Sequence, residues 1–404
     1  MALGQYHFYK ACILVKLYKL MGIEMIRKLI LVCIFLFVFS KPEALCQEDQ
    51  LIFSDTSRKI ENLIQLELNP RDYQRMSQIS GKKEGFKALK LTINGQDAEA
   101  SDIHSRGQST LNFPRKSLSI DLEKPMEFSG HGHQVQLKHL ILLSLAMDKY
   151  YTRNRLAFGM MQEVGLLDFY YSFANLEVNH QSQGIFLLVE RPQDWAIHEV
   201  KSPIVIRRGY GHSIEKAKTS KSLSKSDAKA YENSFRSIYQ LIKNESGSIL
   251  YDSLSQILDL EHYMAWMAFN FLVKNGDYAD EVFFYIEPDS GLFKIIPWDY
   301  DDIFSAFPHE GLAAQRQNPT AYIFSKEDDL DRKIAEDNYL YSKYLEVLKS
   351  LALKLNSFKL KEIFESTYAE LLPFYADPDI LKNVKDDLYP DADLPNLQQE
   401  LAFN

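Results

Sequence analysis

Cysteine is scarce in this 404-residue chain, and its placement excludes several kinds of chemistry. The three cysteines, Cys12, Cys33 and Cys46, all lie within the first 46 residues. The rest of the chain therefore has no thiol nucleophile, no cysteine ligand for zinc and no disulfide. If that part is exported, it must be held together by its core alone.

An excess of basic residues is also missing. The first 46 residues hold six Lys/Arg and two Asp/Glu, so the remainder has 40 basic and 53 acidic side chains and a net charge of −13. A general nucleic-acid-binding protein would show a basic footprint. We therefore expect no nucleic-acid partner, whereas a small anionic ligand held by a few placed cations remains compatible with this charge.

The N-terminal apolar run, residues 29–39, has eleven residues and is too short to span a bilayer comfortably. Arg27 and Lys28 precede it, and small residues near Cys46 follow it. This order is typical of a secretory signal peptide. We predict that residues 1–46 form a cleaved leader.

The true start of this leader would then be Met25, close to the basic residues. We expect the mature chain to be exported to the periplasm, the cell surface or the medium, with no stable membrane span after cleavage. An uncleaved anchor and a lipidated Cys46 are the alternatives. Leu45 is unlike the small residue that precedes the cysteine of a lipobox.

Hydrophobic periodicity changes along the chain. Alternating apolar residues predict mostly strands up to about residue 195, and helical patterns dominate after it. We therefore predict an α+β fold with a β-rich N-terminal lobe (47–195) and a mainly helical C-terminal lobe (196–404). The Lys/Ser-rich residues 216–229 are predicted to be a mobile surface loop. His131, His133 and His139 lack a metal-binding spacing and are interpreted as loop residues.

The most informative stretch is 275–302, a predicted hairpin flanked by carboxylates. Residues 282–286 and 292–296 read as its strands, separated by a Pro-Asp-Ser-Gly turn. Because a hairpin's entry and exit lie at one end, Asp277 and Asp280 should converge with Asp299 and Asp301. Clustered carboxylates are unfavourable unless a cation or proton compensates them. This cluster is the candidate site.

Lys116 is a second candidate. It precedes a predicted strand, 117–122, and shares a face with Leu118 and Ile120. A lysine on a core-facing row needs an anionic partner, for which Glu163 is a candidate. The alternative is a strand-end lysine whose ammonium reaches solvent.

Three blocks of this sequence resemble the CotH family of spore-coat-protein-H-like secreted kinases. They are Arg106 to Ser109 with Phe113 to Ser117; Asp148 with Arg153 to Ala157 and, further on, Val178 to Glu190; and Asn275 to Asp277 with Ile296 to Asp301. The resemblance covers roughly residues 60–310 in the family's order. No known motif covers the last 90 or so residues.

The resemblance implies a two-lobed, protein-kinase-like fold that phosphorylates secreted or surface proteins using ATP and Mg²⁺ or Mn²⁺. Asp277 would orient the acceptor hydroxyl, Asp299 would hold the metal that bridges the phosphates, and Lys116 would pair with the phosphates. Further implied residues are Asp301 and Glu281 for the metal, Arg106, Gly107 and Ser109 for the phosphates, and Glu190 near the adenine.

Two positions depart from the expected pattern. Protein kinases have an asparagine metal ligand five residues after the catalytic aspartate, but Val282 stands there, so that Asp280 or Glu281 would have to substitute. Arg115 occupies a position where the family commonly has lysine. A non-catalytic surface or coat assembly protein and a metal-dependent hydrolase are therefore the alternative functions.

Overall fold

The computed structural model describes residues 59–382, apart from residues 108, 131–132, 147, 149, 210–212, 276–281, 302, 305–321 and 324–325. All described residues belong to one unit, Asp55–Leu394. The boundary between lobes at 195/196 remains a prediction, and it falls inside a short helix, α5 (Pro192–His198). No helix in the described part of the chain is both long and apolar enough to cross a membrane.

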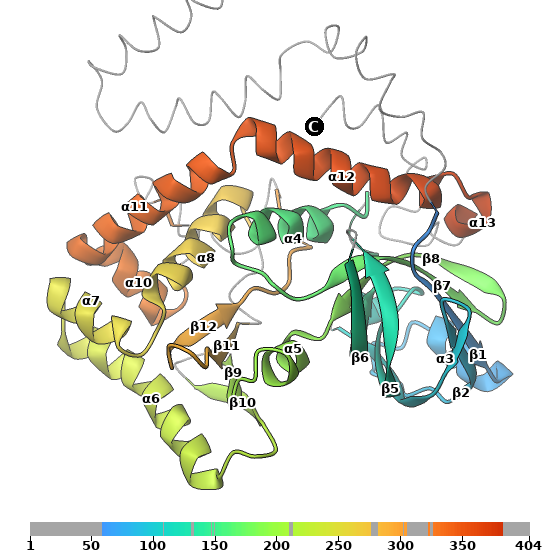
Figure 1. Cartoon of the computed structure of the whole chain (residues 1–404), viewed down its shortest axis with the longest axis horizontal. Coiled ribbons are helices and arrows are strands. Elements are labelled where there is room, and N and C mark those ends of the chain that lie inside the picture. Colours follow the sequence, from blue (N-terminus) through green and yellow to red (C-terminus); the bar gives the residue numbers. More distant parts are fainter. Residues whose placement is uncertain are drawn as a thin grey trace, which may run out of the picture. The chain divides into compact units, whose positions relative to one another are not determined.

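An eight-stranded sheet dominates the first half of the described chain (Figure 1). Its strands are β1 (Leu63–Leu68), β2 (Ala88–Ile93), β3 (Gln96–Ala98), β4 (Ala100–Arg106), β5 (Ser117–Gly130), β6 (His133–Leu143), β7 (Tyr171–Val178) and β8 (Gln181–Glu190). They are ordered β3-β2-β1-β7-β8-β6-β5-β4, and the pairs are antiparallel except for β1 with β7. Antiparallel hairpins join β2 to β3 and β7 to β8.

Alternation along the strands produces two apolar cores, one on each face of this sheet. Leu118 and Ile120 of β5 belong to one core, which is closed by the sheet and by α3 (Pro70–Ser77). Leu187 and Val189 of β8 face the other core, which extends into the helical part of the chain. The central strands therefore read as continuous apolar runs because both of their faces are buried.

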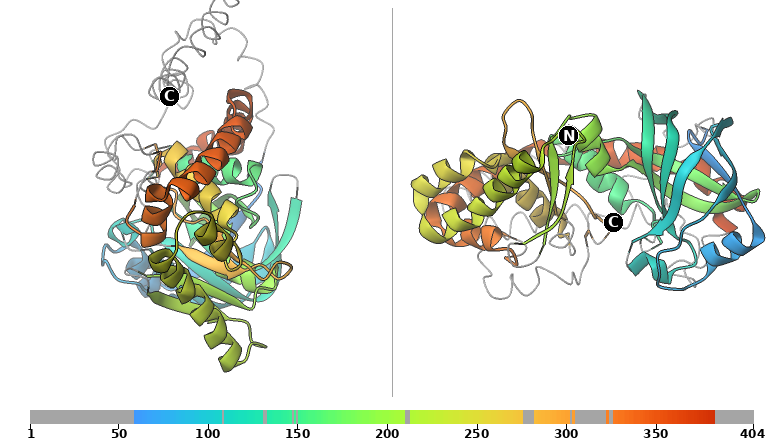
Figure 2. Two further views of the ribbon diagram at one scale, coloured as in Figure 1. Left: turned by 90° about the vertical axis from the view of Figure 1, so that its left-hand side faces the viewer. Right: turned by 90° about the horizontal axis from the view of Figure 1, so that it is seen from below.

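Helices and a smaller sheet form the second half. The helices are α4 (Arg153–Glu163), which lies between β6 and β7 in sequence, α6 (Lys225–Asn244), α7 (Gly247–Ser255), α8 (Leu260–Val273), α10 (Asp329–Glu336), α11 (Asn338–Lys354), α12 (Ser357–Tyr375) and α13 (Pro378–Leu381). The four-stranded sheet has the order β10-β9-β11-β12, with β9 (Ile204–Arg208), β10 (Ile214–Thr219), β11 (Phe283–Ile286) and β12 (Phe293–Ile296). Figure 2 shows α6 and α7 on the side away from the larger sheet.

Two local predictions are wrong. Residues 216–229 are mostly ordered in strand β10 and helix α6, because Ser224 caps the helix by accepting a hydrogen bond from the Asp227 amide. His139 is a strand residue in β6, where its side chain belongs to a charged cluster. Sequence composition suggested loops at both places, but strand pairing and a helix cap outweigh that composition.

Candidate active site

The end of helix α8 meets the segment that follows strand β12. Asp259 caps the start of the helix, and its side chain accepts a hydrogen bond from the His262 amide at 3.0 Å. Asn275, just after the helix, is fully buried, and its Nδ2 donates to the Asp299 carbonyl at 3.2 Å. Positions 275 and 299, on the two sides of the hairpin, are therefore neighbours.

Lys274 ends the helix. It adopts the left-handed conformation, with φ of 50°. Gly276, Asp277, Asp280 and Glu281 lie outside the described residues. The predicted roles of Asp277 and Glu281 therefore stay predictions.

Asp299 has an unusual backbone. Its φ is +65°, in the left-handed region that few residues other than glycine adopt, although aspartate tolerates it better than most. The neighbouring Trp298 and Tyr300 are buried, so the surrounding structure holds this conformation. Backbone strain of this kind occurs most often at functional sites.

The first turn of α4 fixes the same segment. The Asn154 side-chain oxygen accepts a hydrogen bond from the Tyr300 amide at 3.2 Å, and Arg153 Nη1 donates to the Asp301 carbonyl at 3.0 Å. These two residues position the candidate metal ligands Asp299 and Asp301. Both residues belong to the sequence block Arg153 to Ala157, from which no individual role follows. Only the tertiary contact, about 150 positions apart in sequence, reveals that role.

Helix α4 is itself capped from a distance of several residues. Thr152 occupies the cap position, but its side chain makes no capping hydrogen bond. Instead, Asp148 Oδ2 accepts from the Arg153 amide at 2.6 Å, and Oδ1 accepts from the Tyr150 amide at 3.1 Å. Burial raises the pKa of Asp148, while these amides favour its charged form. Asp148 thus orients the turn that holds Asp301.

Arg106 lies beside the candidate metal ligands. Its guanidinium carbon is 5.2 Å from the centre of the Trp298 ring, which is next to Asp299. Gly107, the next residue, has a φ of +99°, and a Cβ there would be 1.9 Å from Thr110 Oγ1. Only glycine fits this turn. The structure therefore brings the end of β4, at Arg106, and the loop that begins at Gly107 close to the segment that contains Asp299.

Lys116 is buried on the predicted face, with 4% of its surface exposed. Its Nζ donates to the carbonyls of Leu111 and Phe113, and burial lowers its pKa. The expected partner is wrong, because Glu163 pairs with Lys359 at 3.4 Å instead. The solvent-reaching alternative is wrong as well. Backbone carbonyls satisfy the ammonium because the loop folds back over it, which strand parity could not reveal.

Two further candidates are Ser109, in the loop between β4 and β5, and Glu190, at the end of β8. Ser109 begins a short 3₁₀ helix, Ser109–Asn112, inside the loop that Lys116 closes. Glu190 ends β8, and its carboxylate accepts a hydrogen bond from the Tyr170 amide at 3.2 Å. Burial raises the pKa of Glu190 to about 7.

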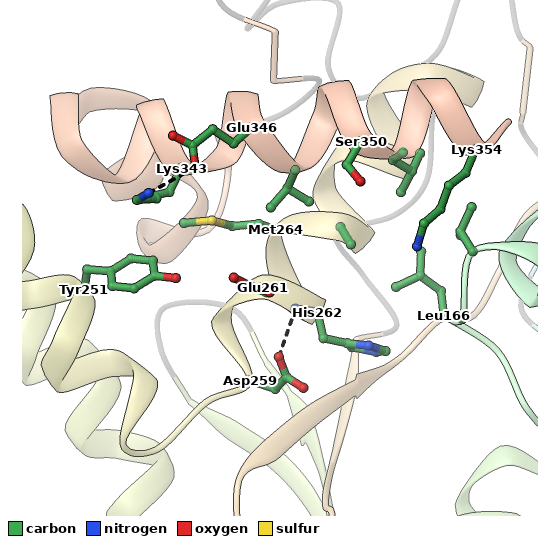
Figure 3. A pocket seen from close by; sticks show the side chains of 15 residues that line it. Leu166, Tyr251, Asp259, Glu261, His262, Met264, Lys343, Glu346, Ser350 and Lys354 are labelled. Carbon is green, nitrogen blue, oxygen red and sulfur yellow. Dashed lines mark hydrogen bonds and ion pairs between the residues drawn. The ribbon is translucent and has the colours of Figure 1, made fainter. Parts of the chain in front are cut away.

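A pocket of about 490 Å³ lies elsewhere on the molecule (Figure 3). It lies between the first half of α8 and α11, and its lining includes His262, Met264, Lys343 and Lys354. An α-helix rises about 1.5 Å per residue, so roughly 15 Å of α8 separates the pocket from Asn275. None of the residues predicted for the site lines it.

Comparison with known proteins decides the family. The family model described as CotH kinase protein matches residues 103–401. The chain belongs to the CotH kinase protein family. It is also 22% identical to the inner spore coat protein H of Bacillus subtilis (strain 168), over 59% of this chain and 68% of that protein.

The CotH match reaches further toward the C-terminus than the three motif blocks do. It includes the C-terminal helices, for which we identified no motif. Helix α12 packs on α4 (Figure 1), and Glu370 of α12 forms a two-point ion pair with Arg155, at 2.5 and 3.0 Å. The C-terminal helices of this CotH protein thus support the helix that anchors Tyr300 and Asp301.

The departure at Val282 is structural as well as chemical. Val282 is buried, and its carbonyl accepts a hydrogen bond from the Arg208 amide at 2.9 Å. The position therefore belongs to the pairing of β9 with β11. An apolar side chain there provides no oxygen for a metal ion.

Proposed function

We propose that this CotH protein is an exported, two-lobed protein kinase that transfers the γ-phosphate of ATP to Ser or Thr of exported or surface proteins. The observation that carries this proposal is the fixed backbone of Asp299. That residue is held in a left-handed conformation between Asn275 and the first turn of α4, with Arg106 stacked on the adjacent Trp298. Phosphoryl transfer depends mainly on such positioning and on charge neutralisation.

The residues divide the work as follows. Asp277 accepts the proton of the substrate hydroxyl and orients its oxygen toward the phosphate. Arg106 supplies a guanidinium suited to phosphate oxygens. Lys116 holds the loop that contains Ser109 in shape through its two carbonyl contacts, and it would have to release them to pair with a phosphate. Gly107 and Ser109 would allow the backbone to approach the phosphates, and Glu190 would contact the adenine.

The donor set fits Mg²⁺ or Mn²⁺. Asp299, Asp301 and Glu281 offer carboxylate oxygens, which hard divalent cations prefer. A divalent ion held by these residues would supply the positive charge that neutralises charge developing on the phosphate oxygens. The contacts of Asn275 and Arg153 fix the backbone of Asp299 and Asp301 before any ion arrives.

An assembly role without catalysis is the second candidate. Val282 stands where a kinase would have a metal ligand, and the Bacillus subtilis relative is an inner spore coat protein. An exported location fits both functions and the predicted leader. The two candidates differ in whether phosphate is transferred.

Incubation with γ-labelled ATP and Mg²⁺ or Mn²⁺, with and without exported host proteins, tests the proposal. We expect label transfer and a nucleotide-dependent rise in melting temperature. Asp277→Asn should abolish transfer but retain the rise. Asp299→Asn should lose both, because it removes the negative charge that holds the metal ion.

Asp289→Asn is the matched control. Asp289 is an exposed residue in the turn at the opposite end of the same hairpin, so this variant should behave like the parent. If the parent shows neither transfer nor a thermal shift, the kinase proposal is wrong and the assembly role gains support. If both site variants resemble the parent, the site is wrongly assigned.

A further inference from the structure

A cluster of two histidines and two aspartates lies outside the candidate active site. His139 comes from β6 in the larger sheet, and Asp194 and His198 come from α5. Residues four apart on a helix share a face, so both α5 side chains point the same way. The Arg191 amide donates to the His139 carbonyl at 3.1 Å, which brings the start of α5 against this strand.

Three potential metal ligands converge in this cluster. Asp194 Oδ1 lies 3.9 Å from His139 Nε2 and 3.6 Å from His198 Nε2, and the three ligand atoms all lie within 4.8 Å of one another. Zn–N bonds of about 2.0–2.1 Å place neighbouring ligands of a tetrahedral ion roughly 3.3 Å apart. Each of the two measured distances would have to shorten by less than about 1 Å for an ion to bind.

A second carboxylate orients the His139 ring. Asp121 Oδ1 lies 3.1 Å from His139 Nδ1 and also accepts from Arg191 Nη2 at 2.5 Å. An ionised carboxylate only accepts hydrogen bonds, so Nδ1 carries a proton and Nε2, which faces Asp194, is the nitrogen left to bind an ion. Metal-binding histidines commonly have this second-shell carboxylate, which fixes the tautomer. The contact between Asp121 and His139 is independent of the distances among the three ligand atoms.

A lysine occupies the place that a metal ion would take. Lys218 Nζ is 2.5 Å from Asp194 Oδ1, the oxygen that faces both histidines. The Lys218 side chain is 40% exposed, whereas that of Asp194 is 5% exposed. A flexible, partly exposed lysine can swing into solvent when another cation binds. Arg191 meanwhile contacts the other oxygen, Oδ2, at 3.4 Å.

We propose that His139, Asp194 and His198 bind a transition-metal ion of the Zn²⁺ class in exchange for the Lys218 ammonium, with the fourth position open to solvent. Imidazole ligands favour such ions, whereas the carboxylate site at Asp299 suits Mg²⁺ or Mn²⁺. The bound ion would join β6 of the larger sheet to α5. The site is independent of the kinase proposal.

Co²⁺ provides a spectroscopic probe of this site. The full chain is titrated with Co²⁺ without nucleotide, with the three leader cysteines changed to serine so that thiolates do not contribute. Asp299→Ala in the same background removes the carboxylate site. We expect one equivalent of Co²⁺ to give the visible absorption of a four-coordinate ion, and Zn²⁺ to displace it.

Three further variants distinguish a metal site from an ion-pair network. His198→Ala should weaken Co²⁺ binding at least tenfold, and Lys218→Ala should strengthen it, because the competing ammonium is gone. His104→Ala is the matched control, since His104 also pairs with an aspartate, Asp102 at 2.7 Å, but lies outside the cluster. An absent absorption band in both the parent and Lys218→Ala, or equal loss in His104→Ala, would overturn the proposal.

Discussion

Several buried charged side chains in the described chain donate hydrogen bonds to backbone carbonyls. Arg115 donates to the carbonyls of Gln183 and Ile185 at 2.9 and 3.0 Å, and Lys116 donates to two loop carbonyls. The Glu190 carboxylate, by contrast, accepts a hydrogen bond from a backbone amide, that of Tyr170. Its carboxylate is therefore the buried acid most sensitive to pH at the candidate nucleotide site.

Glu190→Gln should change how stability depends on pH. Burial raises the pKa of Glu190 from 4.5 to about 7, so between these values the folded protein keeps a proton that the unfolded chain has lost. The free energy of unfolding of the parent therefore falls as pH rises from about 4.5 to about 7. Glutamine keeps the oxygen acceptor without ionising. The difference in free energy of unfolding between variant and parent should be about 1–3 kcal/mol more favourable to the variant at pH 8 than at pH 4.5.

Urea unfolding at a series of pH values measures this difference. Asp331, whose pKa burial also raises to about 7, should contribute a similar slope that stays in the variant. An unchanged slope in Glu190→Gln would show that Glu190 is ionised in the folded protein across this range.

Helix α4 positions part of the candidate site, because its first turn contacts the backbone of Tyr300 and Asp301. The helix depends in turn on Asp148, which caps it from four residues before Thr152. Asp148 therefore holds the first turn of α4, and that turn holds the backbone of Tyr300 and Asp301.

Asp148→Ala should therefore destabilise the protein by about 1–3 kcal/mol, because two backbone amides lose their acceptor. Thr152→Ala should cost less than about 0.5 kcal/mol, since the threonine side chain makes no capping bond. Thermal unfolding measures both changes. Equal losses of stability in the two variants would show that the Thr152 side chain contributes to the cap as much as Asp148 does. We also expect Asp148→Ala to weaken metal-dependent nucleotide binding, which the nucleotide-induced shift in melting temperature would report.

At the scale of the whole described unit, a buried polar network joins segments that are far apart in sequence. Arg208 of β9 donates to the Tyr263 hydroxyl of α8 at 2.8 Å, and that hydroxyl donates to Asp331 of α10 at 2.5 Å. Arg208 Nε also lies 3.4 Å from Asp328. Arg208 and Asp331 are almost fully buried, so each depends on this network for a partner.

Arg208→Met should cost about 3–5 kcal/mol, because it leaves buried carboxylates without their guanidinium. Arg207→Met is the control on the adjacent residue. Arg207 pairs with the exposed Glu215 at 3.0 Å, and the loss of such a pair costs about 1 kcal/mol or less. Chemical denaturation compares the two variants. Similar losses would mean that the Arg208 network contributes no more than a surface ion pair.

Local patterns in the sequence determined much of this protein. Apolar strand segments and turn residues predicted the hairpin of β11 and β12, and motif order predicted the CotH family. These features depend on residues within a few positions of one another, so a single sequence contains them. The approach of the two ends of the hairpin, at Asn275 and Asp299, followed from the same local geometry.

Only the tertiary structure decided the contacts between distant segments. The hydrogen bond of Asn154 with Tyr300 spans 146 positions, and the approach of His139 to Asp194 spans a strand and a helix from different parts of the chain. The carbonyl partners of Lys116 depend on how one loop folds. Such contacts arise from the packing of whole elements against a shared core. Periodicity reports which face of an element is buried, but not which side chains it will meet there.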